Sequence, residues 1–531
     1  MSLINLPNKK ASYSSVDVAA IIYLTIPLLL FICGWLKIWI SIPLVIMILF
    51  SLGIMINQSK SENITFIKEW SYRELLPSIG IFVTYAFLTG MTGNWAQHTD
   101  YYVRNDIFWD LTTKEWPPSL LDGRYFVYYF QTWLPASLIG SVTSWHCALW
   151  AYFAWSCLGI CFVVYYLFKV LGKCSFWIAC IFFTWNGLEL LPCSLIAPIL
   201  RNISVLEAFS TNEHVAGSFL TESPCFSMKN IIHCFIPLSI IGGMLLRPNI
   251  VKTAGPLLGI LAVMYSPMSS IFLLPILTYL FFREHINKIS DLAKWINWSN
   301  ILKDFFSIIN ISFLVPFLLL IIPFYASTKS MLNWHFESIL NFKNICLYIY
   351  YLIFNIGIAG FLILKKEKSK LTWIVLATHC ICILSGMLFH HDVAMKGSVI
   401  TTYFIIVLYC KSSINEKGKF KTAHIIYSIA GLQYFVHMTG ALAATVVSIA
   451  SWVLLRIKFR YIVSIAAFAI TLFFLILLIK PTMFTPIHNK LSGKSVRYHK
   501  TMGIYQPDGG SGLWWWYQTF GNSKDMPIWF K

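Results

Sequence analysis

The stretch Gly93–Gly140 reads GNWAQHTDYYVRNDIFWDLTTKEWPPSLLDGRYFVYYFQTWLPASLIG, and long apolar runs precede and follow it. It concentrates charged side chains in a chain that has few of them: His98, Asp100, Arg104, Asp106, Asp110, Lys114, Glu115, Asp122 and Arg124. Carboxylates, a histidine and aromatic rings beside a membrane suit polar chemistry on a lipid-linked substrate. This loop is therefore expected to be the functional centre.

The composition around this loop is that of a membrane protein. The chain has 531 residues, of which 57% are hydrophobic and 12% are charged, whereas soluble domains carry about 25% charged residues. Apolar runs long enough to cross a bilayer recur from end to end. The first, from Val16, lacks the cleavage site of a signal peptide and is expected to be a retained span. We expect an all-α, polytopic integral membrane protein, because helices satisfy the backbone within lipid.

The apolar runs predict roughly 13–15 transmembrane helices, each long enough or nearly long enough to span the hydrocarbon core. Pro267 separates two of the runs, which favours a break there over one kinked helix. The expected spans are 17–35, 38–56, 76–93, 146–168, 175–196, 228–246, 255–266, 268–282, 305–325, 344–364, 371–389, 398–410, 423–436, 438–455 and 461–479.

The distribution of Lys and Arg predicts the orientation. With the N-terminus inside, the cytoplasmic segments hold 24 of these residues and the outer segments before residue 480 hold 9, which follows the positive-inside rule. The net charge of +18 thus lies mostly between spans, and no nucleic-acid partner is expected. This map gives a plasma (inner) membrane protein with a cytoplasmic N-terminus and an outer C-terminal tail. It requires Tyr125–Trp145 not to cross, so Tyr125–Gly140 is interpreted as an amphipathic helix on the outer surface.

The same map divides the chain into four regions. Residues 1–75 form an N-terminal pair of transmembrane helices, and residues 76–283 form a core that carries the outer loop 93–145. Residues 284–479 supply further transmembrane helices, and residues 480–531 form the outer tail.

Asp100 is the first acid after the third span, in HTDYYVRND. A carboxylate there suits general-base chemistry on an acceptor hydroxyl, or holding a divalent cation against a phosphate. The alternative is that Asp100 caps the helix that follows it. Asp106 and Asp110 are four residues apart on that helix and share a face, as an acid pair or as a polar helix face.

Other candidates lie in later outer segments. Glu189 stands at the outer end of a span, where an acid suggests function. The compact turn from His390 to Ser398, HHDVAMKGS, presents a lysine that can neutralise a phosphate, with an acid one helical turn before it. The alternative is a snorkelling lysine with a local ion pair. The candidate substrate- or phosphate-binding residues are Lys396, Asp392, His391, Arg201, Glu189 and His98, and the candidate metal ligands are Asp100, Glu213 and His214.

The order of these features resembles the GT-C superfamily of polyprenyl-phosphate-dependent membrane glycosyltransferases over roughly residues 76–283. The resemblance rests on a span, an outer loop with an early acid, a Trp-Pro bend at Trp116 and Pro117, and the Pro-bearing stretch YFVYYFQTWLPASLIG. It implies that Asp100 is the catalytic base or metal-linked carboxylate. This chain departs from the family in two respects. Two spans precede the one that leads to the acid, whereas the family usually has the acid after its first span, and the family's common Asp-Glu or Asp-x-Asp doublet is absent.

From Gly93 to about Leu408 the chain also resembles a group of bacterial multi-span membrane proteins without an assigned reaction. HTDYYVRNDIFWDL, NGLELLP and HHDVAMKGS carry that similarity, the last in place of a common Asn-Asp-x-x-Met-Arg. It links the three candidate sites as a set.

The expected function is transfer of a sugar from a polyprenyl-phosphate donor to a surface glycan, lipid-linked or protein acceptor on the outer face. The expected partners are the lipid-linked donor, that acceptor and membrane lipids. The sequence identifies no cofactor, and Mg²⁺ or Mn²⁺ is the candidate. The alternatives are a flippase or transporter of lipid-linked sugars and a surface polysaccharide polymerase or ligase. A flippase needs charged residues deep within several spans, and the expected spans have very few.

Overall fold

The fold is mostly helical. The computed structural model describes residues 13–60, 70–92, 100–118, 124–185, 231–286, 295–327, 352–388, 391–413, 520–522 and 527–531, with short pieces at 224, 227–228, 342, 345–346, 349, 449–450 and 452–453. Within these ranges five helices are long and apolar enough to cross a membrane: Ser15–Trp35, Ile38–Gln58, Trp145–Leu171, Ile308–Ala326 and Val393–Ser413. Three shorter apolar helices accompany them: Ile232–Leu245, Pro267–Arg283 and Lys370–Gly386. The expected all-α membrane class is confirmed at this level, and the total number of spans stays a prediction.

The first two helices form a hairpin. Helix α1 is Ser15–Trp35 and α2 is Ile38–Gln58, close to the predicted spans, and a two-residue parallel pairing of β1 (Tyr13–Ser14) with β2 (Ser59–Lys60) lies at their open end. Large apolar side chains of α2 remain exposed along its length, including Ile42, Ile46 and Phe50. Such a stripe is unfavourable in water and favourable against lipid.

Buried charge fixes the start of α1. Asp17 is fully buried and forms a capping box with Ser14, whose backbone N–H donates to its carboxylate at 2.8 Å. Arg247 makes an ion pair with Asp17, and the Tyr166 hydroxyl donates to the same carboxylate at 3.0 Å. A buried acid is tolerated only when it is paired and hydrogen-bonded in this way. The network ties α1 to the end of α7 and to the α13–α14 connection.

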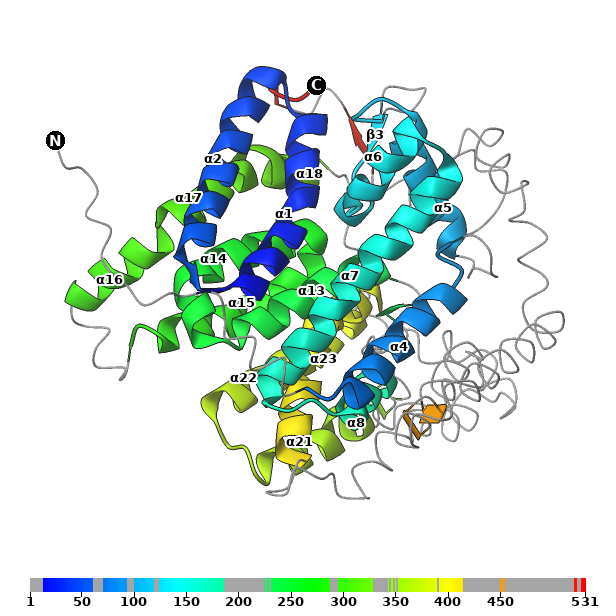
Figure 1. The fold of residues 1–531 in the computed structure, drawn as a ribbon. Coiled ribbons are helices and arrows are strands. Elements are labelled where there is room, and N and C mark those ends of the chain that lie inside the picture. Colours follow the sequence, from blue (N-terminus) through cyan, green and yellow to red (C-terminus); the bar gives the residue numbers. More distant parts are fainter. Residues whose placement is uncertain are drawn as a thin grey trace, which may run out of the picture.

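Two helices lie between the spans α4 (Tyr72–Leu88) and α7 (Trp145–Leu171). They are α5 (Asp100–Thr113) and α6 (Leu134–Val142), and they pack together beside α7 (Figure 1). At nine residues, α6 is about 13 Å long and is too short to cross a bilayer alone. Gly172 ends α7 in the left-handed conformation at φ 65°, which glycine adopts without strain, and α8 (Phe176–Thr184) follows.

Helix α13 (Ile232–Leu245) occupies the centre of the bundle, and all of its residues are buried. It packs against α7, α14 (Pro248–Tyr265) and α23 (His391–Ser413) (Figure 1). Gly242 and Gly243 allow this close packing, because a Cβ on either would meet the rings of Tyr403 or Tyr166. The expected break at Pro267 is confirmed: α14 ends at Tyr265 and α15 (Pro267–Arg283) begins, with the Ser266 side chain as its N-cap.

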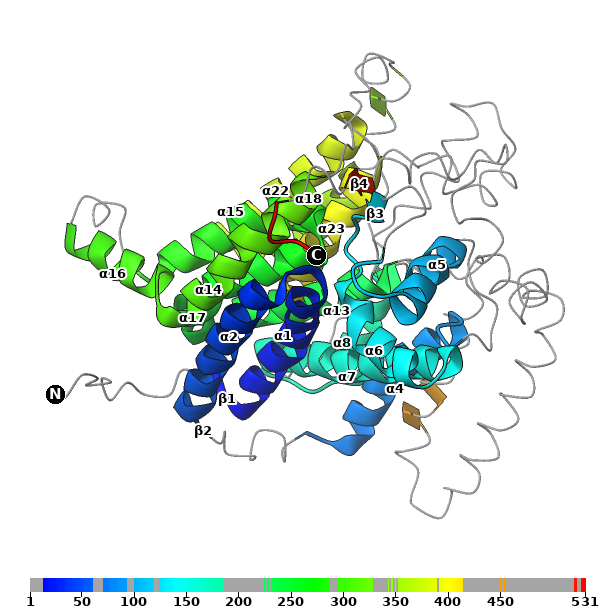
Figure 2. The same ribbon diagram turned by 90° about the horizontal axis from the view of Figure 1, so that it is seen from above.

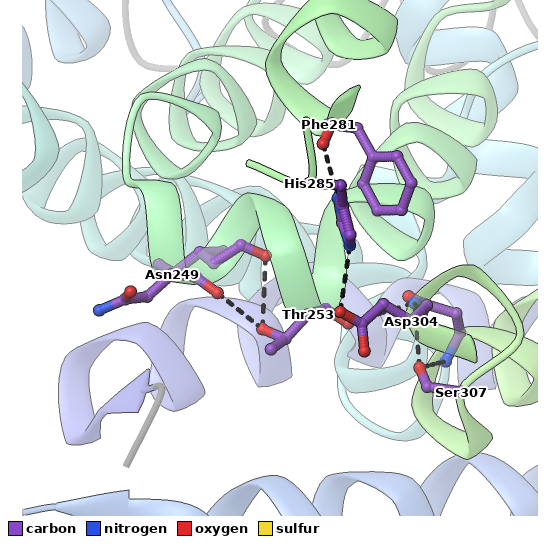
Figure 3. Close-up of polar contacts among 8 residues, drawn as sticks. Asn249, Thr253, Phe281, His285, Asp304 and Ser307 are labelled. Carbon is purple, nitrogen blue, oxygen red and sulfur yellow. Dashed lines mark hydrogen bonds and ion pairs between the residues drawn. The ribbon is translucent and has the colours of Figure 1, made fainter. Parts of the chain in front are cut away.

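A polar cluster connects α15 to α16 (Trp295–Phe305) and α17 (Ile308–Pro316). His285 lies between the Phe281 carbonyl oxygen, 2.8 Å from Nδ1, and the Asp304 carboxylate, 3.1 Å from Nε2 (Figure 3). The Asn310 amide donates to the Asp304 and Thr253 carbonyl oxygens at 2.8 and 3.1 Å. Polar residues next to the membrane thus satisfy one another here.

The remaining described elements complete the bundle. Helix α17 continues through a π-helical turn into α18, and a second π-helical turn leads into α21, which is followed by α22 against α23 and α15. Their bounds are η3 Phe317–Ile321, α18 Ile322–Ala326, η4 Ile353–Gly357, α21 Ile358–Leu364 and α22 Lys370–Leu388.

The C-terminal residues return to the α1–α2 turn. The Lys37 N–H donates to the Trp529 carbonyl at 2.9 Å, and the Lys531 N–H donates to the Trp35 carbonyl at 2.9 Å. Both views place the C-terminus beside this hairpin (Figures 1 and 2). Nearby, β4 (Phe520–Asn522) pairs antiparallel with β3 (Arg124–Phe126) of the loop between α4 and α7. The end of the tail and the predicted outer loop therefore meet at the same end of the molecule.

Candidate functional site

The site is built on an aromatic segment between β3 and α6. Val127–Phe130 and the 3₁₀ turn η1 (Gln131–Trp133) are buried, and Gln131 is fully enclosed. The Tyr128 and Tyr129 rings stack with centroids 3.9 Å apart. The Thr132 hydroxyl donates to the His233 carbonyl at 2.6 Å, which anchors this segment to the first turn of α13.

The expected surface helix Tyr125–Gly140 is wrong for its first half. The structure has a strand, a buried irregular segment and a 3₁₀ turn there, and the helix begins only at Leu134. Pro135 explains the difference, because proline fits the first turn of a helix but removes a hydrogen bond from a helix interior. Tyr128, Tyr129, Phe130 and Trp133, which suggested an interfacial belt, are instead packed inside the protein.

Two cations approach this segment from different helices. The Lys396 ammonium, on α23, lies 5.7 Å from the centre of the Tyr129 ring, within the range of a cation–π contact. Arg104, on α5, is also buried. Burial raises the pKa of Tyr128 well above its ordinary value, while Lys396 and Arg104 act to lower it. Both cations also lie within electrostatic range of His233. The structure therefore brings positive charge from α5 and α23 to one aromatic cluster.

The predicted turn from His390 to Ser398 is wrong. Helix α23 already begins at His391, so Lys396 stands in its second turn with 9% of its surface exposed. Asp392 near the N-terminus suits the helix dipole, and Ala394, Met395 and Lys396 are strong helix formers. The Ser269 hydroxyl of α15 donates to the Lys396 carbonyl at 2.5 Å and holds this turn in place.

A pocket opens beside the cluster, between the end of α4, α5, η1, α7 and α13. Its cavity measures about 20 Å³, which is room for about one water molecule. Its lining combines aromatic rings with polar groups: Met91, Arg104, Asn105, Phe108, Trp133, Leu149, Tyr152, Ile232 and His233. Apolar walls thus surround a few polar groups, in a cavity much smaller than that of a typical small-molecule site.

His233 is the residue of this site that the sequence did not reveal. It is 1% exposed, its ring is 4.8 Å from that of Trp133, and it stacks on Tyr129 at 5.4 Å. Neither ring nitrogen has a hydrogen-bond partner within the described part of the chain. The available signal was a histidine at the start of a predicted span, IIHCFIPL, because a titratable residue at membrane depth indicates function.

The acids on α5 stand in different situations. The helix expected after Asp100 is confirmed, and Asp100 is its first residue, one helical turn before Arg104 and on the same face. Asp110 is paired with Lys114, whose ammonium lies 2.7 Å from its carboxylate. Asp110 is thus engaged in a local ion pair, which argues against its predicted role in an acid pair with Asp106. The Asp100 and Asp106 side chains lie outside the described part of the structure.

Several predicted site residues also lie outside it. Asp392 and His391 are placed on α23 by their backbone only, and Asp392 is one turn before Lys396. The residues in the undescribed segments are His98, Glu189, Arg201, Glu213 and His214. Among the described residues no group of three or more His, Cys, Asp or Glu side chains could hold a metal ion.

No family model, curated protein or solved structure matches this chain. The arrangement of the site itself therefore has to support any functional assignment. Described residues of α5, η1, α13 and α23 provide a cationic, aromatic cluster and a pocket, with the predicted base at the start of α5.

Proposed function

We propose that the protein is a membrane glycosyltransferase that transfers a sugar from a polyprenyl-phosphate donor to a glycan, lipid-linked or protein acceptor. The observation that carries the proposal is that Lys396 lies against the Tyr129 ring, while Arg104 lies beside His233, which stacks on the same ring. Two helices far apart in the sequence thus bring buried cations to one place beside a pocket. Buried cations of this kind are suited to a phosphate group.

In the proposed reaction Asp100 accepts the proton of the acceptor hydroxyl as that oxygen attacks the anomeric carbon of the donor. The new glycosidic bond forms from the face opposite the phosphate, so the configuration inverts. The bond between the anomeric carbon and the phosphate oxygen breaks, and the polyprenyl phosphate leaves with the bonding electrons. Lys396 and Arg104 stabilise the negative charge that develops on it.

Asp100→Asn tests this proposal. The amide keeps the size of the side chain and its capability as a helix cap, but it cannot accept a proton. Loss of a general base lowers turnover by about 10²–10⁴-fold. We expect this loss in transfer from polyprenyl-phosphate sugars by purified protein, with unchanged amounts in the membrane.

Asp106→Asn is the matched control, because it makes the same chemical change on the same helix, and a smaller loss is expected. Near-normal transfer by Asp100→Asn would exclude this residue as the base. If the wild-type protein moves a lipid-linked sugar across vesicles and transfers none, the flippase alternative takes the place of this proposal.

A further inference from the structure

Helix α16 presents an apolar surface on the outside of the described structure. It lies at the edge of the bundle, beside α14 and directly before α17 (Figures 1 and 2). Trp298, Leu302 and Phe305 are exposed by 37%, 44% and 38%, and they share one face because they follow at spacings of four and three residues. The adjoining Phe306 is 50% exposed, with its ring 5.0 Å from that of Phe305. A contiguous apolar surface of this kind marks a place that a partner covers.

A second face of α16 is attached to the protein. Ile301 is buried, and Asp304, three residues later on the same face, has its carboxylate 3.1 Å from Nε2 of His285 (Figure 3). The Asp304 carbonyl accepts a hydrogen bond from the Asn310 amide at 2.8 Å, which links the end of α16 to α17. A surface helix in water turns its charged residues outward. Here the acid is turned toward the protein, while three large apolar side chains face outward.

The exposed part of α16 also has a polar side. Ser299, Asn300 and Lys303 are exposed, and at 3.6 residues per turn they lie together, away from the side that carries Leu302 and Phe305. An amphipathic helix in the plane of a membrane surface has this arrangement, because its apolar side meets the acyl chains and its polar side meets the headgroups.

The apolar side of α16 is continuous with the surface that suits lipid. Helix α17 begins three residues after Phe305, as the first part of the membrane-crossing helix Ile308–Ala326, and Ile308 is 52% exposed. The hydroxyls of Ser51 on α2 and Ser312 on α17 lie 2.6 Å apart, so α17 packs against α2. The exposed apolar stripe of α2 includes Phe50, next to Ser51. The apolar surface therefore runs from α2 across the start of α17 to α16.

Helix α16 lies where several helices begin or end. The Trp298 ring is 6.0 Å from that of Phe282, the residue before the last of α15. The Asn310 amide of α17 donates to the carbonyl of Thr253, in the second turn of α14, at 3.1 Å. Tryptophan and lysine both favour the boundary between headgroups and acyl chains. The position of α16 at these helix ends therefore matches the surface of the membrane.

We propose that α16 is an interfacial helix that binds lipid in the headgroup region of the leaflet at this end of the bundle. The predicted orientation makes this the cytoplasmic leaflet. The apolar side of α16 inserts into the upper acyl chains, Lys303 lies at the lipid phosphates, and the His285–Asp304 contact holds the helix at that depth. This assignment is independent of the proposed sugar transfer.

Nitroxide labels on single cysteines measure the surroundings of each side of α16. The full-length, cysteine-depleted protein is reconstituted in lipid vesicles, with one label introduced by Leu302→Cys, Phe305→Cys, Asn300→Cys or Lys303→Cys. All four positions are exposed, so the label replaces no buried side chain. We expect the first two labels to collide more with oxygen, which concentrates in the acyl chains. The other two should collide more with a water-soluble nickel chelate present on both sides of the membrane. Ile42→Cys, on the exposed stripe of α2, provides the lipid reference.

Two results would overturn the inference. Equal access of the nickel chelate to all four labels would show that the apolar side of α16 lies in water. Shielding of the Leu302→Cys label from both reagents, with spin–spin broadening that disappears when unlabelled protein is mixed in, would show that a second copy of the chain covers this face.

A pair of charge substitutions tests whether lipid holds the helix. In the Phe305→Cys protein, Leu302→Glu places a charge on the lipid side, so the label should lose oxygen contact and gain nickel contact. Asn300→Glu is the matched control, because it places the same charge on the polar side of the same helix, and the label should keep its depth. An unchanged depth in Leu302→Glu would contradict the proposal.

Discussion

At the scale of single residues, burial decides what a side chain can do, and burial is what the sequence shows least. Lys396 was expected to project from a turn, with snorkelling as the alternative, yet it is buried in a helix beside Tyr129. His233 was not singled out at all, because its importance comes from the Trp133 and Tyr129 rings that surround it. Those contacts join residues about 100 positions apart, and no local pattern predicts them.

Lys396→Met should weaken donor binding about tenfold or more, since it removes one charged hydrogen-bond partner of the phosphate and keeps the length of the side chain. Binding of a short isoprenyl phosphate to the purified variant measures the effect. Lys411→Met is the control on the same helix. Lys411 is largely exposed and faces Glu367 at 3.3 Å, so donor binding should be unchanged, and an equal loss in both variants would exclude a specific role for Lys396.

Asp110 should make stability depend on pH in a defined direction. Burial raises the pKa of this carboxyl above its ordinary value, while Lys114 opposes the rise. The folded state then binds the proton more tightly than the unfolded state, so this contribution to stability is full below the ordinary pKa and is lost as the pH rises through the raised pKa. As the pH rises from the ordinary carboxyl pKa through the raised pKa, the thermal midpoint of Asp110→Asn should therefore fall less than that of the wild type.

Lys114→Met provides the complementary measurement. Without the ammonium 2.7 Å away, the pKa of Asp110 should rise further, and the loss of stability should move to higher pH. A midpoint profile that is identical in the wild type and both variants would show that Asp110 does not titrate differently on folding.

At the scale of elements, the sequence predicts well where one strong signal acts alone. Long apolar runs identified α1, α2 and α7, and Pro267 placed the α14–α15 break correctly. The prediction failed where tertiary contacts override composition. The aromatic stretch before Pro135 resembles a membrane-surface helix, but Val127–Trp133 folds into a buried segment, because η1 packs against the apolar helices α1 and α13. Candidate acids, histidines and lysines could be chosen from the sequence, but the sequence did not show which of them lie close together.

Gly243→Ala should destabilise the bundle, because α13 approaches α7 too closely for a Cβ, which would overlap the Tyr166 side chain. Overpacking of this kind costs about 1–3 kcal/mol, visible as a lower thermal midpoint in detergent. Gly53→Ala is the matched control on α2, where a Cβ meets nothing within 4 Å. Alanine in an open helical position is stabilising by up to about 1 kcal/mol, so opposite shifts are expected, and a neutral Gly243→Ala would show that α13 can move away.

At the scale of the whole molecule, the two ends of α1 contact different parts of the chain. Asp17, Tyr166 and Arg247 meet at one end of α1, and Trp35, Lys37 and the C-terminal residues meet at the other. The 21 residues of α1 extend about 30 Å, which is the thickness of the hydrocarbon core. Segments that the Lys and Arg count assigned to the same side thus lie together, although the count itself contains no spatial information.

This arrangement gives the last prediction, which concerns the sidedness of the chain. In a cysteine-depleted background, single cysteines at Lys37 and Lys531 should react with a membrane-impermeant thiol reagent added to intact cells. Both positions lie at the α1–α2 turn, where the Lys531 ammonium donates to the Cys33 carbonyl at 2.7 Å, and the predicted orientation puts this turn outside. A cysteine at Lys252, on α14 beside the Arg247 end, should react only after the membrane is opened. If the cysteine at position 252 is labelled in intact cells and those at positions 37 and 531 are protected, the predicted orientation is wrong and the proposed site lies on the cytoplasmic face. Labelling of Lys37 and Lys531 from different sides would contradict the shared end itself.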